Sequence, residues 1–175
     1  MSTQVSSSPA LPIAYLTLRF LVVLNWLGGI AILALLVVAP TRQWIMSSLD
    51  LFPSAEADRI VMGLRSIAVL GLVCIPLNYM ILSRLLAIVA TVRAGDPFVA
   101  DNAFHLQAIA WVMLGLQVLS IVIGLIAKGI STPEHPIRMN AGFSITGWLA
   151  VLLTFLLARV FAEGAMMRED LVGMV

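Results

Sequence analysis

Four long apolar runs constrain this chain more than any other feature of its sequence. A helix needs about 20 mostly apolar residues to cross a bilayer, because the hydrocarbon core is about 30 Å thick and a helix rises about 1.5 Å per residue. Runs of this length lie at about residues 14–39, 60–92, 104–130 and 141–161. Soluble cores do not produce four such runs in 175 residues. The sequence therefore predicts an all-α, polytopic membrane protein with four transmembrane helices in an antiparallel bundle.

The composition supports this class. Hydrophobic residues make up 61% of the chain and charged residues 11%, whereas an ordinary soluble domain has about 45–50% apolar and about 25% charged residues. These values exclude a soluble globular enzyme, a disordered chain and a protein that binds nucleic acid through a basic surface. The net charge of +1 gives no sign of a polyanionic partner, and the single cysteine, Cys74, excludes an intrachain disulfide.

The segments outside the apolar runs predict the domain organisation. Residues 1–12, MSTQVSSSPALP, are polar and serine-rich, which is typical of a mobile tail. They lack the basic start and small-residue cleavage site of a signal peptide, so we expect an uncleaved first helix. Residues 13–165 then form the four-helix transmembrane domain, and residues 166–175 form a C-terminal tail.

The second apolar run is too long for a plain span. From Arg59 to Arg93 it would extend about 50 Å as a helix, so it must tilt, protrude or bend. Pro76 predicts a kink within it, and Ser54 is expected to cap its start. Residues 42–52 before it predict either a short helix lying in the membrane interface or an ordinary loop.

The basic residues do not orient the chain by the positive-inside rule. Four spans place both termini on one side, together with half of the 10 basic residues: Arg19, Arg84, Arg93, Arg159 and Arg168. The opposite side holds the other half: Arg42, Arg59, Arg65, Lys128 and Arg138. The arginines within the spans either snorkel to lipid headgroups or form a basic rim for anionic lipid or an acidic partner. Arg159 and Glu163 can face each other on one helix.

Four uncharged polar residues fall at a common depth when the spans are threaded antiparallel. Counted from the terminal side, their depths agree within about one helical turn; the residues are Asn25, Asn78, Gln117 and Thr154. We therefore predict a polar layer in the bundle interior to which all four helices contribute. Two interpretations stay open: interhelical hydrogen bonds that hold the bundle together, and a site for a small molecule or ion.

Residue patterns for catalysis, metals and cofactors are not found in the sequence. His105 and His135 lie roughly 45 Å apart if the chain between them is helical, so one haem iron cannot bind both. There is no glycine-rich phosphate loop, no clustered metal ligands and no nucleophile with a base in a known context. We expect no cofactor and no enzymatic activity. Glycines at 28, 29 and 124, with Ser120, predict close helix packing.

Two hydrophilic segments carry the clearest motifs. In the loop that starts at Arg93, Gly95 can end the preceding helix in a left-handed conformation and Pro97 cannot continue it. Phe98 is then expected to fold back on the apolar helix ends. The second segment is the C-terminal tail, which follows Gly164, carries charges and ends in apolar residues. Its residues of interest are Arg168, Glu169, Asp170, Leu171, Gly173 and Val175.

At these residues the chain resembles the DUF2975 family, bacterial membrane proteins with four spans. Gly95, Pro97, Phe98 and Asn102 look like the family's loop, and Gly164, Arg168, Glu169, Asp170, Leu171, Gly173 and Val175 look like its tail, with Met174 departing from the polar residue expected there. Arg93 and Asp96 complete the loop that we predict to bind a partner. The resemblance implies a bacterial inner membrane location with cytoplasmic termini and a cytoplasmic loop. It implies no biochemical activity, but members are often encoded beside small helix-turn-helix regulators.

The leading functional prediction is a non-enzymatic membrane protein that binds a partner through its loop and tail, such as a helix-turn-helix regulator held at the membrane. The first alternative is an accessory subunit of a larger membrane complex. The second is small-molecule or lipid binding at the polar layer. We expect contact with the lipid bilayer and with a protein partner, and no direct contact with nucleic acid. The sequence leaves the oligomeric state open, including a homo-oligomer.

Overall fold

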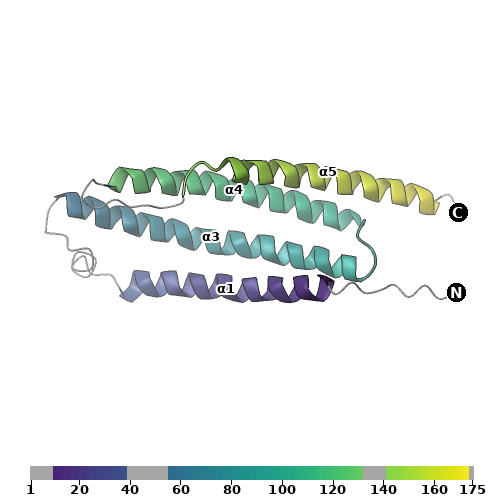
Figure 1. Ribbon diagram of the computed structural model, residues 1–175, viewed down its shortest axis with the longest axis horizontal. Helices are drawn as coiled ribbons and strands as arrows, with labels where there is room; N and C mark the ends of the chain where they lie inside the picture. Colours follow the sequence, from purple (N-terminus) through teal and green to yellow (C-terminus); the bar gives the residue numbers. More distant parts are fainter. Residues whose placement is uncertain (1–9, 39–54, 132–140, 174–175) are drawn as a thin grey trace.

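The structure, a computed structural model, describes residues 10–38, 55–131 and 141–173. Four helices occupy nearly all of these residues: α1 (Ala10–Val38), α3 (Ala55–Arg93), α4 (Ala100–Ile130) and α5 (Ile145–Gly173). Consecutive helices run in opposite directions (Figure 1). Each is long and apolar enough to cross a membrane. The predicted fold class is confirmed, and the chain has the architecture of a multi-pass membrane protein.

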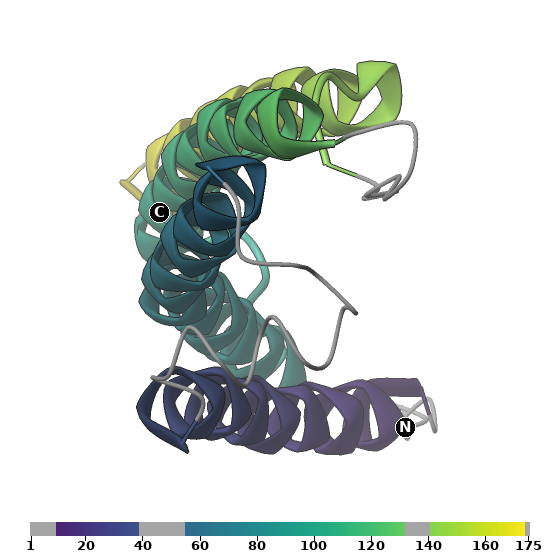
Figure 2. The same cartoon turned by 90° about the vertical axis from the view of Figure 1, so that its left-hand side faces the viewer.

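The helices form an open row in the order in which they occur in the chain. In the described residues, α1 contacts only α3, α3 also contacts α4, and α4 contacts α5. Viewed along the helices, the row curves into an arc that leaves α1 far from α4 and α5 (Figure 2). Figure 1 places the start of α1, the α3–α4 connection and the end of α5 at one end of the row, which we call the terminal end.

The ends of α1 and α5 differ from the predicted spans. Residues 10–12, which we predicted as part of the mobile tail, belong to α1; Pro12 lies in the first turn, where its missing N–H breaks no helical bond. α5 starts at Ile145 because the Ser144 hydroxyl accepts a hydrogen bond from the Gly147 N–H at 3.2 Å and caps the helix. Most of the segment expected to be a tail continues α5 to Gly173.

The longest helix is α3, with 39 residues or about 58 Å. It therefore exceeds the hydrocarbon core, as predicted, and it continues through Pro76 without ending. The predicted cap, Ser54, and the predicted interfacial segment at residues 42–52 lie outside the described residues.

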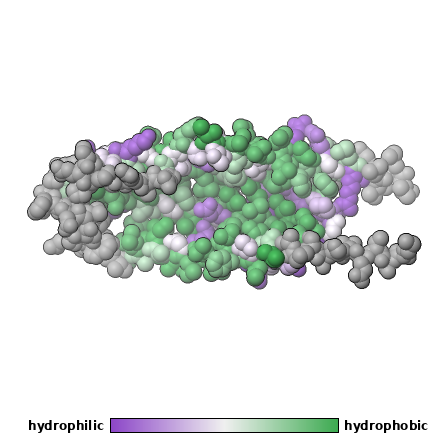
Figure 3. All heavy atoms as spheres, viewed as in Figure 1, coloured by the Kyte–Doolittle hydropathy of each residue, from purple (hydrophilic) through white to green (hydrophobic). Residues whose placement is uncertain are grey.

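The surface between the two ends of the row is apolar. Hydrophobic residues cover the middle of the molecule, and hydrophilic residues gather mainly toward its ends (Figure 3). Large apolar side chains of α1, such as Leu16 and Phe20, are 71% and 65% exposed. Such surface is stable only against lipid tails or other apolar protein, which agrees with a membrane location.

Candidate functional site

The loop between α3 and α4 is held in a defined conformation at the terminal end. Gly95 has φ of 86°, which only glycine adopts without strain. The Gly95 N–H donates to the Val92 carbonyl and the Asp96 N–H donates to the Thr91 carbonyl, both at 3.1 Å. This pair of bonds is a Schellman motif, which satisfies the last carbonyls of a helix. The predicted left-handed Gly95 is confirmed.

The side chain of Asn102 holds the loop in place through hydrogen bonds. Its side chain is completely buried, and its amide group donates to the Thr91 hydroxyl at 2.7 Å and to the Pro97 carbonyl at 2.8 Å. The Thr91 hydroxyl donates in turn to the Ile88 carbonyl at 2.7 Å. Both amide hydrogens of Asn102 are therefore used to join α3, the loop and α4. Its Oδ1 atom is buried without a partner in the described residues.

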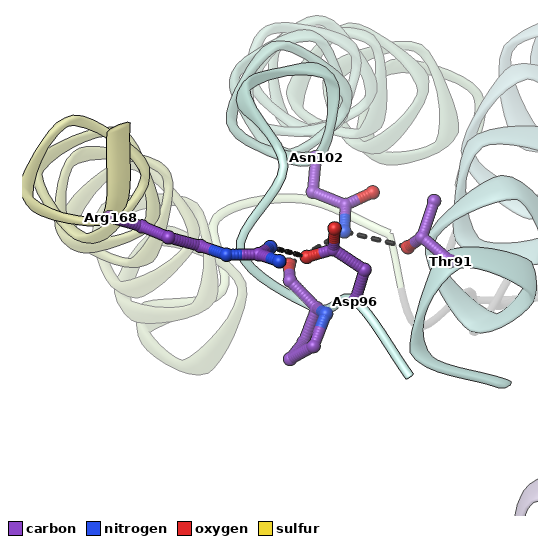
Figure 4. A network of polar contacts seen from close by, with 5 residues as sticks. Thr91, Asp96, Asn102 and Arg168 are labelled. Atoms are coloured by element: carbon purple, nitrogen blue, oxygen red, sulfur yellow. Dashed lines mark hydrogen bonds and ion pairs between the residues drawn. The ribbon is translucent and has the colours of Figure 1, made fainter. Parts of the chain in front are cut away.

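The end of α5 closes over the same loop. Phe98 packs against Phe161, with ring centroids 5.4 Å apart, so it folds back on the helix ends as predicted. A Cβ atom on Gly164 would lie 3.0 Å from the Phe98 ring, which shows how closely the ring approaches the helix. Arg168 forms an ion pair with Asp96, which Figure 4 shows beside the Asn102–Thr91 hydrogen bond. We call the surface of Asp96, Pro97, Phe98 and Arg168 the loop–α5 surface.

Not all of the predicted loop and tail residues join this surface. Glu169, Asp170, Leu171 and Gly173 lie in the last part of α5, and Val175 lies outside the described residues. Arg93 is exposed and lies against Tyr15 of α1, with its guanidinium carbon 5.3 Å from the ring centroid. It therefore belongs to the α1–α3 side of the terminal end.

The residues of the predicted polar layer are divided between two helix pairs, α1–α3 and α4–α5. Asn25 donates to the Ile75 carbonyl of α3 at 3.0 Å, and Asn25 and Asn78 line one pocket of about 280 Å³ with four leucine and isoleucine side chains. Asn78 makes no hydrogen bond within the described residues. Asn25 of α1 and Asn78 of α3 therefore lie at a similar depth along their helices, as predicted.

Gln117 and Thr154 lie on the other side of the row, between α4 and α5. Gln117 covers Gly147, where an added Cβ would lie 2.0 Å from its amide nitrogen, and the Thr154 hydroxyl bonds to the Ala150 carbonyl of its own helix at 2.7 Å. Because α1 contacts only α3 in the described residues, the prediction of one interior shared by all four helices is wrong. The common depth followed from threading, but depth does not determine which helices are neighbours.

The charged residues of the terminal end form two kinds of contact. Arg159 pairs with Glu163 at 3.0 Å, as predicted. The sequence reasoning missed the contact between Arg84 of α3 and His105 of α4, whose Nη1 and Nδ1 atoms lie 3.3 Å apart. Opposite helix direction and similar depth were the signals that could have paired these residues. His135 lies outside the described residues.

The arrangement supports binding through ion pairs, hydrogen bonds and apolar contact. No group of three or more metal-ligating side chains occurs in the described part of the chain. Comparison with protein-family models, curated proteins and solved structures finds no match. The function is therefore argued from the loop–α5 surface itself.

Proposed function

We propose that this chain is a non-enzymatic integral membrane protein that binds a protein partner at the loop–α5 surface. The observation that carries the proposal is that Asp96 and Arg168, far apart in sequence, form an ion pair beside Phe98. Phe98 keeps 45% of its surface exposed. An exposed aromatic ring within a charged rim on a fixed backbone has the composition of a protein interaction site.

The identity of the partner follows from the resemblance to DUF2975. We propose membership of that family, a bacterial inner membrane location and cytoplasmic termini, which together expose the loop–α5 surface to soluble proteins. The partner is then a small helix-turn-helix regulator, held at the membrane by this surface. The chain itself does not contact the nucleic acid.

Co-purification from native membranes tests the proposal. The tagged full-length protein is isolated in a mild detergent, and the proteins recovered with it are identified and quantified by mass spectrometry. Phe98→Ala is expected to lower recovery of the soluble partner at least about tenfold, because aromatic anchors dominate binding energy. Arg168→Asp is expected to lower it too, and the paired reversal of Asp96→Arg with Arg168→Asp restores the ion pair and part of the binding.

The control for charge is Lys128→Asp, which makes the same charge change near the opposite end of α4. It is expected to leave recovery unchanged. If Phe98→Ala, Arg168→Asp and the parent protein recover the same soluble protein in the same amount, the loop–α5 surface is not the binding site. Recovery of a DNA-binding protein in near-equal amount would also support the family assignment.

The open row favours a second candidate, an accessory subunit of a larger membrane complex. In the described residues, no side chain of α1 belongs to the buried apolar core, and Trp26 is 50% exposed. A neighbouring membrane subunit could cover this face. Recovery of membrane proteins in a fixed ratio, unaffected by Phe98→Ala, would support this candidate over the first.

A further inference from the structure

Two arginines converge on one aromatic ring at the α1–α3 side of the terminal end. The guanidinium carbon of Arg19 lies 5.5 Å from the Tyr15 ring centroid and that of Arg93 lies 5.3 Å from it. Arg19 and Tyr15 belong to α1, and Arg93 belongs to the last turn of α3. Cation–π contacts thus hold two positive charges around a single side chain.

These charges are not neutralised within the described residues. Arg159 and Arg168 each have a carboxylate partner, whereas Arg19 and Arg93 have none in the part of the chain that the structure describes. The end of α3 places only a partial negative charge near Arg93, and its Ala90, Thr91 and Val92 carbonyls each accept an N–H group. An anion between the two arginines would remove their mutual repulsion and gain charge-assisted hydrogen bonds.

An apolar depression on the surface of α1 runs beside Arg19. Its volume is about 540 Å³, and Leu16, Thr17, Phe20 and Val23 line it with Arg19. The Thr17 hydroxyl donates to the Ile13 carbonyl of its own helix at 2.9 Å, so it needs no partner in the depression. In a bilayer, such a surface favours a hydrocarbon chain over water.

The position of the cluster along the row matches the membrane surface. Tyr15 lies beside Arg93, the last residue of α3, and tyrosine is enriched at the membrane–water interface. A headgroup at the arginines and an acyl chain along α1 are therefore arranged as they are in a single phospholipid.

We propose that this chain binds an anionic phospholipid at the end of α1 and α3. The lipid phosphate contacts the Arg19 and Arg93 guanidinium groups beside Tyr15, and one acyl chain occupies the depression along α1. The site is separate from the loop–α5 surface and does not depend on a protein partner. The bound lipid would join α1 and α3, which share few other polar contacts.

Lipid binding to the full-length protein tests the site. The purified protein is titrated with fluorescent phosphatidylglycerol or phosphatidylcholine in a mild detergent, and lipid retained by the folded protein is counted by native mass spectrometry. Phosphatidylglycerol is expected to bind more tightly than phosphatidylcholine. Arg19→Gln and Arg93→Gln are each expected to weaken phosphatidylglycerol about fivefold, and Tyr15→Leu to weaken it less. Tyr15→Phe keeps the ring and is expected to bind as the parent does.

The matched control is Arg159→Gln, which removes one exposed arginine from the same end of the row. It is expected to leave phosphatidylglycerol binding unchanged. Equal binding of the two lipids, or an equal loss in Arg159→Gln and Arg19→Gln, would overturn the proposal, because general surface charge would then explain the binding. Full competition by inorganic phosphate would also overturn it in favour of a free-anion site. Circular dichroism identifies variants that fail to fold. The comparison of Tyr15→Phe with Tyr15→Leu then tests, without a change in charge, whether the aromatic ring contributes to phosphatidylglycerol binding.

Discussion

The α4–α5 pair and the α1–α3 pair are both antiparallel helix pairs, but they are held together differently. Between α4 and the segment that leads into α5, Ser120 bonds to both the N–H and the carbonyl of Gly142 at 3.2 and 3.3 Å. Gly124 lets that backbone approach closely, since an added Cβ would lie 2.7 Å from the Ala141 carbonyl oxygen. This pair therefore depends on direct backbone and side-chain packing.

The α1–α3 pair has fewer such contacts. A Cβ atom added to Gly29 would lie 3.1 Å from the Ile75 side chain, but one added to the neighbouring Gly28 would have nothing within 4 Å. In the described residues, one side-chain hydrogen bond joins the helices, from Asn25 to the Ile75 carbonyl. Two ring contacts also join them, between Trp26 and Tyr79 and between Arg93 and Tyr15. The difference teaches that one half of the protein is built as a packed core and the other relies on its membrane surroundings.

The largest effect is expected from Asn102→Ala, where α3, the loop and α4 meet. It removes two hydrogen bonds from a completely buried position and leaves the Pro97 carbonyl without its donor, which costs about 3 kcal/mol. The matched change Asn78→Ala, at a half-buried asparagine with no hydrogen bond in the described residues, is expected to cost far less. The two apparent melting temperatures in one mild detergent measure the difference. Similar values would mean that Asn78 has a partner of comparable strength.

A smaller effect is expected from Gly124→Ala. The new methyl group would clash with the backbone at Ala141 and Gly142, and overpacking of this kind costs about 1–3 kcal/mol. Gly28→Ala makes the same chemical change in open space and is expected to be neutral or slightly stabilising. Thermal unfolding of the two variants checks this contrast. An unchanged melting temperature in Gly124→Ala would show that the segment before α5 moves without penalty.

The smallest effect is expected from Asn25→Leu. Removal of the bond to Ile75 should cost about 0.6–2 kcal/mol, the range for polar contacts between membrane helices. Because this bond is one of few between α1 and α3, the loss is expected to appear first as easier release of α1. Protease cleavage or hydrogen exchange of α1 measures this. Unchanged protection of α1 would mean that apolar contacts alone hold it.

The sequence predicted what depends on hydropathy and local backbone rules. The four helices, the turn at Gly95 and the shared depth of Asn25 and Asn78 all followed from run lengths and residue types. It did not predict the open row. Lipid tails are as apolar as leucine, so the bilayer does not determine which face of α1 or α5 packs against protein. A helix that is apolar on all sides therefore has no sequence pattern that predicts its neighbours.

The candidate site shows the same limit. Gly95 and Pro97 were recognisable because turn rules act over a few residues, whereas Asn102 was singled out only by the resemblance to DUF2975. The contacts of Phe98 with Gly164 and of Asp96 with Arg168 join positions on separate helices. Likewise, nothing near Arg93 in the sequence points to Tyr15. These pairings depend on how far each helix slides along its neighbour, which the sequence does not fix within a turn.

The order of the row also bears on synthesis. Every pair of described helices in contact is consecutive among them, so no helix has to wait for a distant part of the chain before it finds its neighbour. Contacts between consecutive elements form quickly, because little chain must be closed into a loop. Each new hairpin can assemble as its second helix enters the bilayer, and α5 completes the loop–α5 surface last. A chain stalled before α5 would thus already hold α1, α3 and α4 in place, but without a cover for Phe98.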